Sequence, residues 1–306
     1  MTQLHDPVLY EEVREIYLSQ TQKHIVVDAT TGLGGHAGMM ASALGSDDIF
    51  IGFDRDNENL SLARSHIESL GTVCQSHYIH SSFAFLQEKL EEKGIQEIDF
   101  ILYDLGVSSV HYDVADRGFS FRFDGPLDMR FDRTRGKTVT DILMTLDAPE
   151  LARIFTTYGE EKKSWFIAQA IVKARKIETI DTTFKLLKII EESSFDQKSP
   201  TRVFQALRIA LNEEFENIES SLKQALDLLS VGGKILVITF HSLEDRLVKN
   251  IFAPYLEDTI NEVTGQIQVK SKYKKYTKKP IIPTEAEIDR NPRSRSAKMR
   301  VIERIY

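Results

Sequence analysis

The sequence is poor in the features that mark secreted and membrane-bound proteins. Its 306 residues include one cysteine, Cys74, so no internal disulfide can form, as is typical of proteins in a reducing cytoplasm. No apolar run approaches the roughly 20 residues that a membrane-spanning helix needs. The N-terminal segment lacks the basic start and the apolar stretch of a secretory signal. These absences predict a soluble, cytoplasmic protein without a membrane partner.

Several catalytic motifs are absent as well. No G-x-x-x-x-G-K-[ST] loop occurs, which excludes P-loop nucleotide chemistry. His241, Ser242 and Asp245 have the residue types of a hydrolase triad, but no G-x-S-x-G elbow accompanies them, and a helix cap at Ser242 is the simpler interpretation. Cys74, His77 and His80 are spaced like loose metal ligands without an evident fourth, so no metal site is predicted.

Charge is unevenly distributed along the chain. The formal net charge is -7, which by itself argues mildly against a nucleic-acid partner. Two segments nevertheless carry no carboxylate at all: residues 270–279 read K-S-K-Y-K-K-Y-T-K-K, and residues 290–300 read R-N-P-R-S-R-S-A-K-M-R. Such segments fit either a solvated basic loop or a surface that contacts RNA, and charge alone leaves both open.

The apolar pattern predicts an α/β protein. Short apolar runs at 24–28, 49–54, 99–104 and 234–240 are separated by segments of helical period, which is typical of a parallel sheet covered on both faces. About 130 residues separate the last two runs, far more than a crossover needs. We therefore expect one α/β domain formed by residues 1–111 and 199–306, with a helical domain inserted at 112–198.

Acidic residues end three of the expected strands. Asp28 precedes a glycine-rich turn at Gly32–Gly35, Asp54 ends the next strand, and Asp104 ends a later one. Three carboxylates at one sheet edge suit a cationic ligand that also carries an amine and a ribose, which favours S-adenosylmethionine. The same turn also fits the G-x-G-x-x-A pattern of nicotinamide-dependent oxidoreductases, which stays the alternative. The acids could also simply cap helices.

Longer segments resemble one family, the small-subunit ribosomal RNA methyltransferases H, also called MraW. The most distinctive is R-G-F-S-F-R-F-D-G-P-L-D-M-R at 117–130. The others, in chain order, are H-D-P-V-L-Y-E-E-V at 5–13, G-G-H at 34–36, G-F-D-R-D at 52–56, D-L-G-V-S-S at 104–109, Y-G-E-E at 158–161, P-T-R-V-F-Q-A-L-R-I-A-L-N-E at 200–213, F-H-S-L-E-D-R at 240–246 and N-P-R-S-R-S-A at 291–297.

The resemblance implies a class I methyltransferase, Rossmann-like fold with a helical insertion. It implies S-adenosylmethionine as cofactor and transfer of its methyl group to the exocyclic 4-amino group of a cytidine in the decoding region of 16S ribosomal RNA, with the small ribosomal subunit as partner. The cofactor positions of the family map onto Gly34, Gly35, His36, Asp54, Phe83, Asp104 and His111. His111 stands where the family usually has glutamine, which puts its role in doubt.

Asp104 is also the candidate catalytic residue. A cytosine amine is a poor nucleophile because its lone pair is delocalised, and an acceptor for its N–H would make it more nucleophilic.

Two further groups of residues could contact RNA. Phe119–Phe123 alternates aromatics with Arg122 and could stack on bases or form a hairpin strand. Arg202, Arg208 and Asn212 could form a phosphate-binding face or a solvated one.

Overall fold

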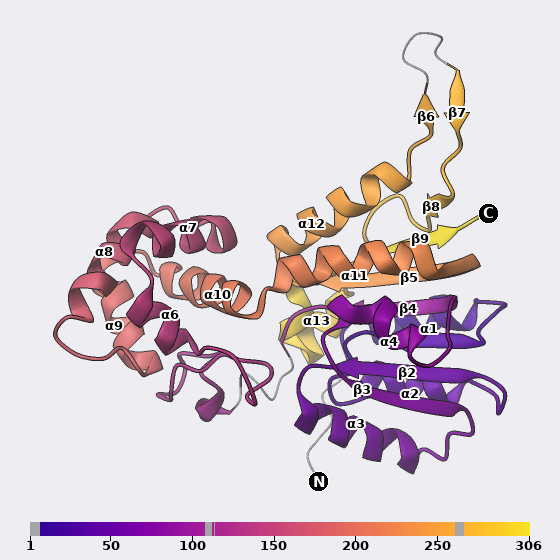
Figure 1. Cartoon of the computed structure of the whole chain (residues 1–306), viewed down its shortest axis with the longest axis horizontal. Coiled ribbons are helices and arrows are strands. Elements are labelled where there is room, and N and C mark those ends of the chain that lie inside the picture. The colour runs from indigo at the N-terminus through magenta and orange to yellow at the C-terminus, as the bar shows by residue number, and fades with distance from the viewer. Residues whose placement is uncertain (1–6, 108–111, 113, 261–265) are drawn as a thin grey trace. The chain divides into compact units, whose positions relative to one another are not determined.

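The computed structural model describes residues 7–107, 112, 114–260 and 266–306. It divides into two compact units, one formed by residues 1–106 and 215–306 and the other by Val107–Glu214. The first five strands of the larger unit all run parallel, and β9 and β8 are antiparallel additions at one side. The predicted α/β class with a mostly parallel sheet is therefore confirmed (Figure 1).

The sheet of the larger unit has the strand order β3-β2-β1-β4-β5-β9-β8. Its strands are β1 Ile25–Asp28, β2 Ile49–Asp54, β3 Gln75–His80, β4 Ile98–Asp104, β5 Leu229–Thr239, β8 Tyr273–Lys275 and β9 Lys298–Arg304. The order reverses between β1 and β4, and in sheets of this kind ligands bind in the crevice beyond the carboxyl ends of the strands at this point.

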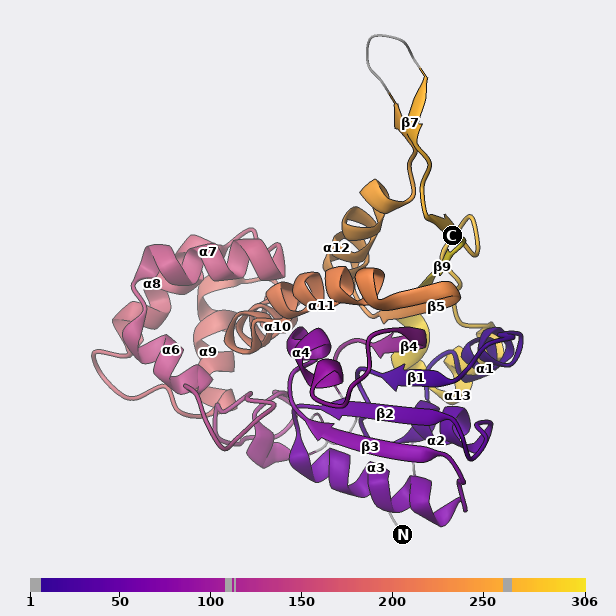
Figure 2. The ribbon, with the colours of Figure 1, turned by 45° about the vertical axis from the view of Figure 1, so that its right-hand side comes forward.

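Helices cover both faces of the sheet, as the apolar strands require (Figure 2). Successive side chains of a strand point to opposite faces, so Val26 packs with α1 and α2 while Val27 packs with α4, α11 and α12. The helices of this unit are α1 Tyr10–Leu18, α2 Gly35–Ser42, α3 Asn57–Ser69, α4 Leu86–Glu91, α11 Glu214–Leu228, α12 Ser242–Phe252 and α13 Glu285–Arg290. Short 3-10 turns are η1 Phe83–Phe85, η3 Ala253–Tyr255 and η4 Pro292–Ser296, and β6 Thr259–Ile260 pairs with β7 Ile267–Val269 in a separate hairpin.

The smaller unit is helical, with its own apolar core. Its elements are η2 Ala115–Arg117, α6 Val139–Thr145, α7 Ala148–Gly159, α8 Ser164–Ala174, α9 Thr183–Ser194 and α10 Ser199–Asn212. The expected boundary at 198/199 is wrong by a whole helix: α10 belongs here because its apolar side chains Val203, Phe204 and Leu207 complete this core. Glu213, with φ of 52°, ends α10 and separates it from α11 of the larger unit.

None of the described helices combines the length and the apolar character that a membrane span requires.

Candidate active site at the carboxyl edge of the sheet

Three predicted carboxylates meet at the carboxyl edge of the parallel strands. Asp28 ends β1, Asp54 ends β2 and Asp104 ends β4, and parallel pairing places these ends side by side. Thr30 joins two of them, since its N–H donates to Asp28 Oδ1 at 3.0 Å and its Oγ1 accepts from Asp104 N–H at 2.7 Å. The acids therefore form one constellation at the point where the strand order reverses.

Each of these carboxyl groups has a raised pKa. Burial raises the pKa of Asp28 to about 7, against hydrogen bonds from Thr30. Burial, with smaller contributions from Asp56 and Asp28, raises the pKa of Asp54 to about 7. Burial and the charges of Asp28 and Glu244 raise the pKa of Asp104 to about 8. A cation bound beside these three acids would favour their ionised forms.

Asp54 also shapes the glycine-rich turn. Its Oδ2 accepts from Gly32 N–H at 2.8 Å, and its Oδ1 accepts from Asp56 N–H at 2.8 Å. Each carboxylate oxygen can accept a second hydrogen bond, so both bonds leave room for a ligand hydroxyl. Asp54 is thus fixed in orientation while it retains acceptor capacity.

The glycines of the turn are required by the packing of the chain. Gly34 has φ of +90°, and a Cβ there would lie 3.1 Å from Ala63 Cα. A Cβ on Gly35 would lie 2.4 Å from Pro7 Cγ, so the N-terminal segment rests directly on the first turn of α2. The glycines that predicted a ligand-binding turn are therefore also needed for the close packing of this turn against Ala63 and Pro7.

His36 is buried beside the same N-terminal segment. Its Nε2 lies 3.1 Å from the Val8 carbonyl oxygen, which requires Nε2 to carry the proton, and its ring stacks on Tyr10. Burial lowers the pKa of His36 to about 4, so the ring is neutral. Its Nδ1 is then an acceptor, buried and without a partner among the residues that the structure describes.

Of the two remaining predicted positions, Phe83 can be placed relative to this edge. Phe83 follows β3 and packs edge-on against Tyr103, the neighbour of Asp104, with ring centroids 5.7 Å apart. His111 lies outside the described residues, as do His5, Asp6, Ser108 and Ser109 of the family-like segments. The structure thus brings Gly34, Gly35, His36, Asp54 and Asp104 together, and the role of His111 stays a prediction.

Asp104 has an open acceptor. Its Oδ1 is buried and has no hydrogen-bond partner in the described part of the chain, and its Oδ2 lies 3.9 Å from His36 Nε2, too far for a hydrogen bond. An unsatisfied buried oxygen is costly unless a ligand donor meets it. This oxygen is the observation that best fits a bound group with N–H or ammonium donors.

The sequence did not reveal Glu244, whose charge contributes to the raised pKa of Asp104. Glu244 is buried, and its Oε2 accepts from Phe240 N–H at 2.8 Å. The helix cap lies one residue earlier than expected: His241 caps α12 and Glu244 closes the box, while Asp245 pairs with Arg300 instead of capping. A histidine cap has no strong sequence signature, because Ser242 offers the more usual residue at the next position.

The expected RNA contacts of the smaller unit are mostly internal. Phe119 is buried and stacks on Phe131, and no strand forms at 119–123, so the base-stacking interpretation fails for Phe119. Arg208 is buried in a two-point ion pair with Glu214, at 2.8 and 2.9 Å. The phosphate-binding face is likewise contradicted, because Arg202 pairs with Glu161 and Asp196, and Asn212 binds the backbone of Phe131 and Met129.

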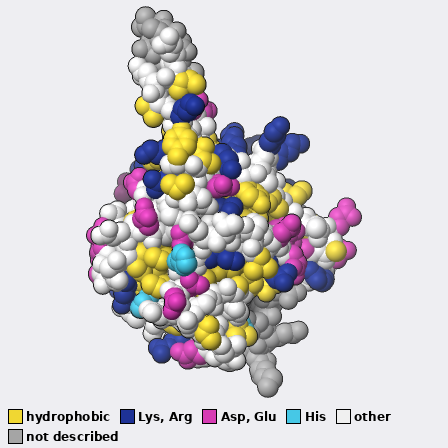
Figure 3. Space-filling view, turned by 90° about the vertical axis from the view of Figure 1, so that its right-hand side faces the viewer, with side chains coloured by type: hydrophobic (Ala, Val, Ile, Leu, Met, Phe, Trp, Pro, Cys, Tyr) yellow, Lys and Arg dark blue, Asp and Glu magenta, His cyan; other side chains and the backbone are white. Residues whose placement is uncertain are grey.

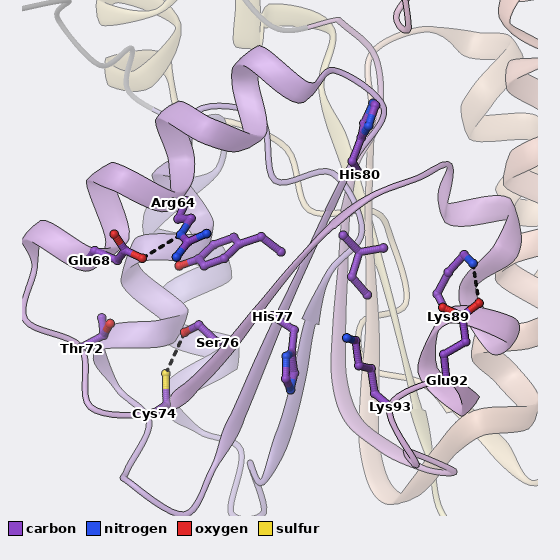
Figure 4. A pocket seen from close by; sticks show the side chains of 12 residues that line it. Arg64, Glu68, Thr72, Cys74, Ser76, His77, His80, Lys89, Glu92 and Lys93 are labelled. Atoms are coloured by element: carbon purple, nitrogen blue, oxygen red, sulfur yellow. Dashed lines mark hydrogen bonds and ion pairs between the residues drawn. The ribbon is translucent and has the colours of Figure 1, made fainter. Parts of the chain in front are cut away.

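A polar cavity of about 690 Å³ lies elsewhere, beside the edge strand β3 (Figure 4). It contains Cys74, His77 and His80, the residues with loose metal-ligand spacing. Cys74 Sγ lies 3.6 Å from Ser76 Oγ, and His80 Nε2 lies 3.1 Å from the Arg55 carbonyl oxygen. Among the described residues no group of three or more potential ligands could hold a metal ion.

Comparison with known proteins gives one consistent result. The sequence matches the family described as the MraW methylase family over residues 2–305. Relatives named ribosomal RNA small subunit methyltransferase H are 43% identical in Citrifermentans bemidjiense, with 98% of both chains covered, and 43% identical in Acinetobacter baylyi, with 98% of this chain and 99% of that one covered. A relative of the same name from Bacteroides thetaiotaomicron is 43% identical over 91% of this chain and 90% of its own.

Proposed function

The chain belongs to the MraW methylase family, and from this premise we propose that it transfers a methyl group from S-adenosylmethionine to the 4-amino group of a cytidine in 16S ribosomal RNA. The small ribosomal subunit, and with it the cytoplasm, is the proposed place of action. The observation that carries the proposal is the family match across almost the whole chain, with the three strand-end acids in place. The oxidoreductase left open by the glycine pattern is not favoured by membership in a methylase family.

The site fits the cofactor in charge and in hydrogen bonding. S-adenosylmethionine supplies a methyl group on a positively charged sulfur, together with an ammonium group and ribose hydroxyls. Asp28 and Asp104 would hold positive charge at the carboxyl ends of β1 and β4. Asp54, Gly34, Gly35 and His36 would hold the remaining polar groups, and Phe83 would offer an apolar surface.

Asp104 is the proposed acceptor for the amine proton of the substrate. Its pKa of about 8 leaves Asp104 mostly protonated at neutral pH when no cation is nearby. A cation in the site favours the carboxylate, which can then accept an N–H of the cytosine amine and restore electron density to its nitrogen. Cofactor binding would therefore favour the form of Asp104 that acts as an acceptor.

Methyl transfer to isolated small subunits tests the proposal. Subunits from a strain that lacks the gene are incubated with the enzyme and with S-adenosylmethionine labelled in its methyl group, and the RNA is digested to nucleosides. We expect label in one N4-methylated cytidine of 16S RNA, and none when the subunits come from a strain that has the gene. Label in another nucleoside, or in no RNA, would reject the proposal. Calorimetry with NAD and with S-adenosylmethionine tests the oxidoreductase alternative. That alternative requires that NAD binds and that S-adenosylmethionine does not bind.

A further inference from the structure

The two basic segments of the chain lie at opposite ends of β9. This strand is antiparallel to β5, with Lys298 paired to Thr239 at the carboxyl end of β5 and Glu303 paired to Lys234 towards its start. Asp104 pairs with Ile238, so the residues just before Lys298 reach the sheet edge that carries the strand-end acids. β8 pairs with the other end of β9, where Tyr273 faces Arg304.

The separation of the two segments follows from strand geometry. Lys298 to Arg304 is a single strand, and at about 3.3 Å per residue its ends lie roughly 20 Å apart. Lys and Arg side chains gather around the base of the projecting β6–β7 hairpin in Figure 3, close to β8. The segment 270–279 is more strongly basic than the segment 290–300. Its residues in β8, however, pair with the end of β9 that is farther from Asp104.

The turn at 291–297 holds its arginines outward on a fixed backbone. Ser294 is fully buried, and its N–H and Oγ both donate to the Asn291 carbonyl, at 2.9 and 2.8 Å. Ala297, also buried, donates its N–H to the Ser294 carbonyl at 2.8 Å. Arg293 and Arg295 flank the buried serine and are exposed. A fixed turn loses little backbone entropy when its side chains bind a ligand.

An acidic neighbour pairs with the basic residues of the adjacent strand, and the turn itself carries two exposed arginines. Asp245 pairs with Arg300 at 2.7 Å and lies 3.5 Å from Lys298. Arg295 forms no ion pair with a carboxylate in the portion of the chain that the structure describes. Guanidinium groups match phosphate oxygens with two parallel hydrogen bonds, which makes arginine the suited residue for a sugar-phosphate backbone.

We propose that Arg293 and Arg295 bind the RNA phosphates next to the target nucleotide, at the edge of the sheet where the methyl group is transferred. The inference rests on the proposed function, because it takes RNA as the substrate. On a chain with a net charge of -7, an RNA strand must be attracted locally, and this turn offers positive charge beside the strand-end acids. The lysines of β8 contribute at most to distant attraction.

Paired double variants test the assignment in the full chain. R293Q/R295Q removes two charges from the turn, and K272Q/K275Q removes two exposed charges from the opposite end of β9. Methyl transfer to unmethylated small subunits gives kcat and KM. Filter binding of a single-stranded RNA with the decoding-region sequence gives Kd against salt, and calorimetry with S-adenosylmethionine reports an intact cofactor site.

For R293Q/R295Q we expect KM for the subunits to rise at least tenfold with kcat changed less than twofold. The salt slope of RNA binding should fall by about 1.4, because each lost phosphate contact on a single strand contributes about 0.7. K272Q/K275Q should change KM less than threefold. Equal effects of the two variants, or no effect of the first, overturn the proposal. If the unaltered enzyme binds RNA but methylates none, the proposed function fails, and the RNA-binding comparison still decides the role of the turn.

Discussion

Glu287 and Leu9 are joined across 278 positions of the sequence. Glu287 Oε1 accepts from Leu9 N–H at 2.8 Å, and both residues are buried. The two residues before Leu9 rest on the cofactor turn: Pro7 lies against Gly35, and the Val8 carbonyl accepts from His36. A carboxyl group near the end of the chain thereby fixes the N-terminal segment that orients His36.

Removing this acceptor should weaken cofactor binding. In Glu287→Ala the buried Leu9 N–H is left unsatisfied, at a cost of about 1–3 kcal/mol. The N-terminal segment should then move away from His36 so that the Leu9 N–H can meet water. Because His36 would lose its fixed orientation, we expect the Kd for S-adenosylmethionine to rise about tenfold in calorimetry. Glu287→Gln keeps an acceptor oxygen and should bind almost as the unaltered chain does. Glu285→Ala, exposed on the same helix, is the matched control. A Glu287→Ala protein that unfolds more easily but binds the cofactor normally would reduce the contact to a purely structural one.

Asp54 should be indispensable for the cofactor. Asp54→Ala removes both the acceptor for ligand hydroxyls and the bond that holds Gly32, so we expect Kd for S-adenosylmethionine to rise at least a hundredfold. Asp47→Ala removes an exposed carboxylate just before β2 and should leave Kd unchanged. Unchanged affinity in Asp54→Ala would remove this residue from the site.

Strand ends were predictable from the sequence because apolar runs and strands coincide here. Asp28, Asp54 and Asp104 each close such a run, and parallel pairing then brings them together. The predicted boundary at 198/199 failed because helical period does not say which core an apolar face joins, and the break at Glu213 is a left-handed residue without a glycine to announce it.

Polar contacts between distant residues were beyond the reach of sequence patterns. Nothing in the local sequence of α13 marks Glu287 as the partner of Leu9. Arg208 looked like a phosphate ligand because charge and helical spacing do not reveal burial, and its partner Glu214 lies just past the break in the helix. Such pairs depend on the packed geometry of both partners.

The Arg208–Glu214 pair should stabilise the smaller unit rather than bind RNA. Both side chains are nine-tenths buried, and loss of one partner leaves a buried charge uncompensated. We expect Arg208→Ala to lower the free energy of unfolding by about 3 kcal/mol in urea titrations. The salt slope of RNA binding should stay that of the unaltered protein. A lower slope with unaltered stability would reinstate the phosphate-binding interpretation. Arg153→Ala, a change on the neighbouring helix α7, serves as the control.

Stability and cofactor affinity should respond to pH in opposite directions. The pKa values of Asp28 and Asp54, about 7, and of Asp104, about 8, lie above the ordinary value of 3.8, so the folded chain retains protons that the unfolded chain releases. The cofactor-free protein should therefore lose stability as pH rises from about 4 to 8, and its Tm should fall over that range. A cation binds best to the ionised acids, so affinity for S-adenosylmethionine should increase from pH 6 to about 9 and then level off. Asp104→Asn cannot ionise, and its Tm should fall less between pH 6 and 9. An equal fall in both proteins would mean that Asp104 does not titrate in this range.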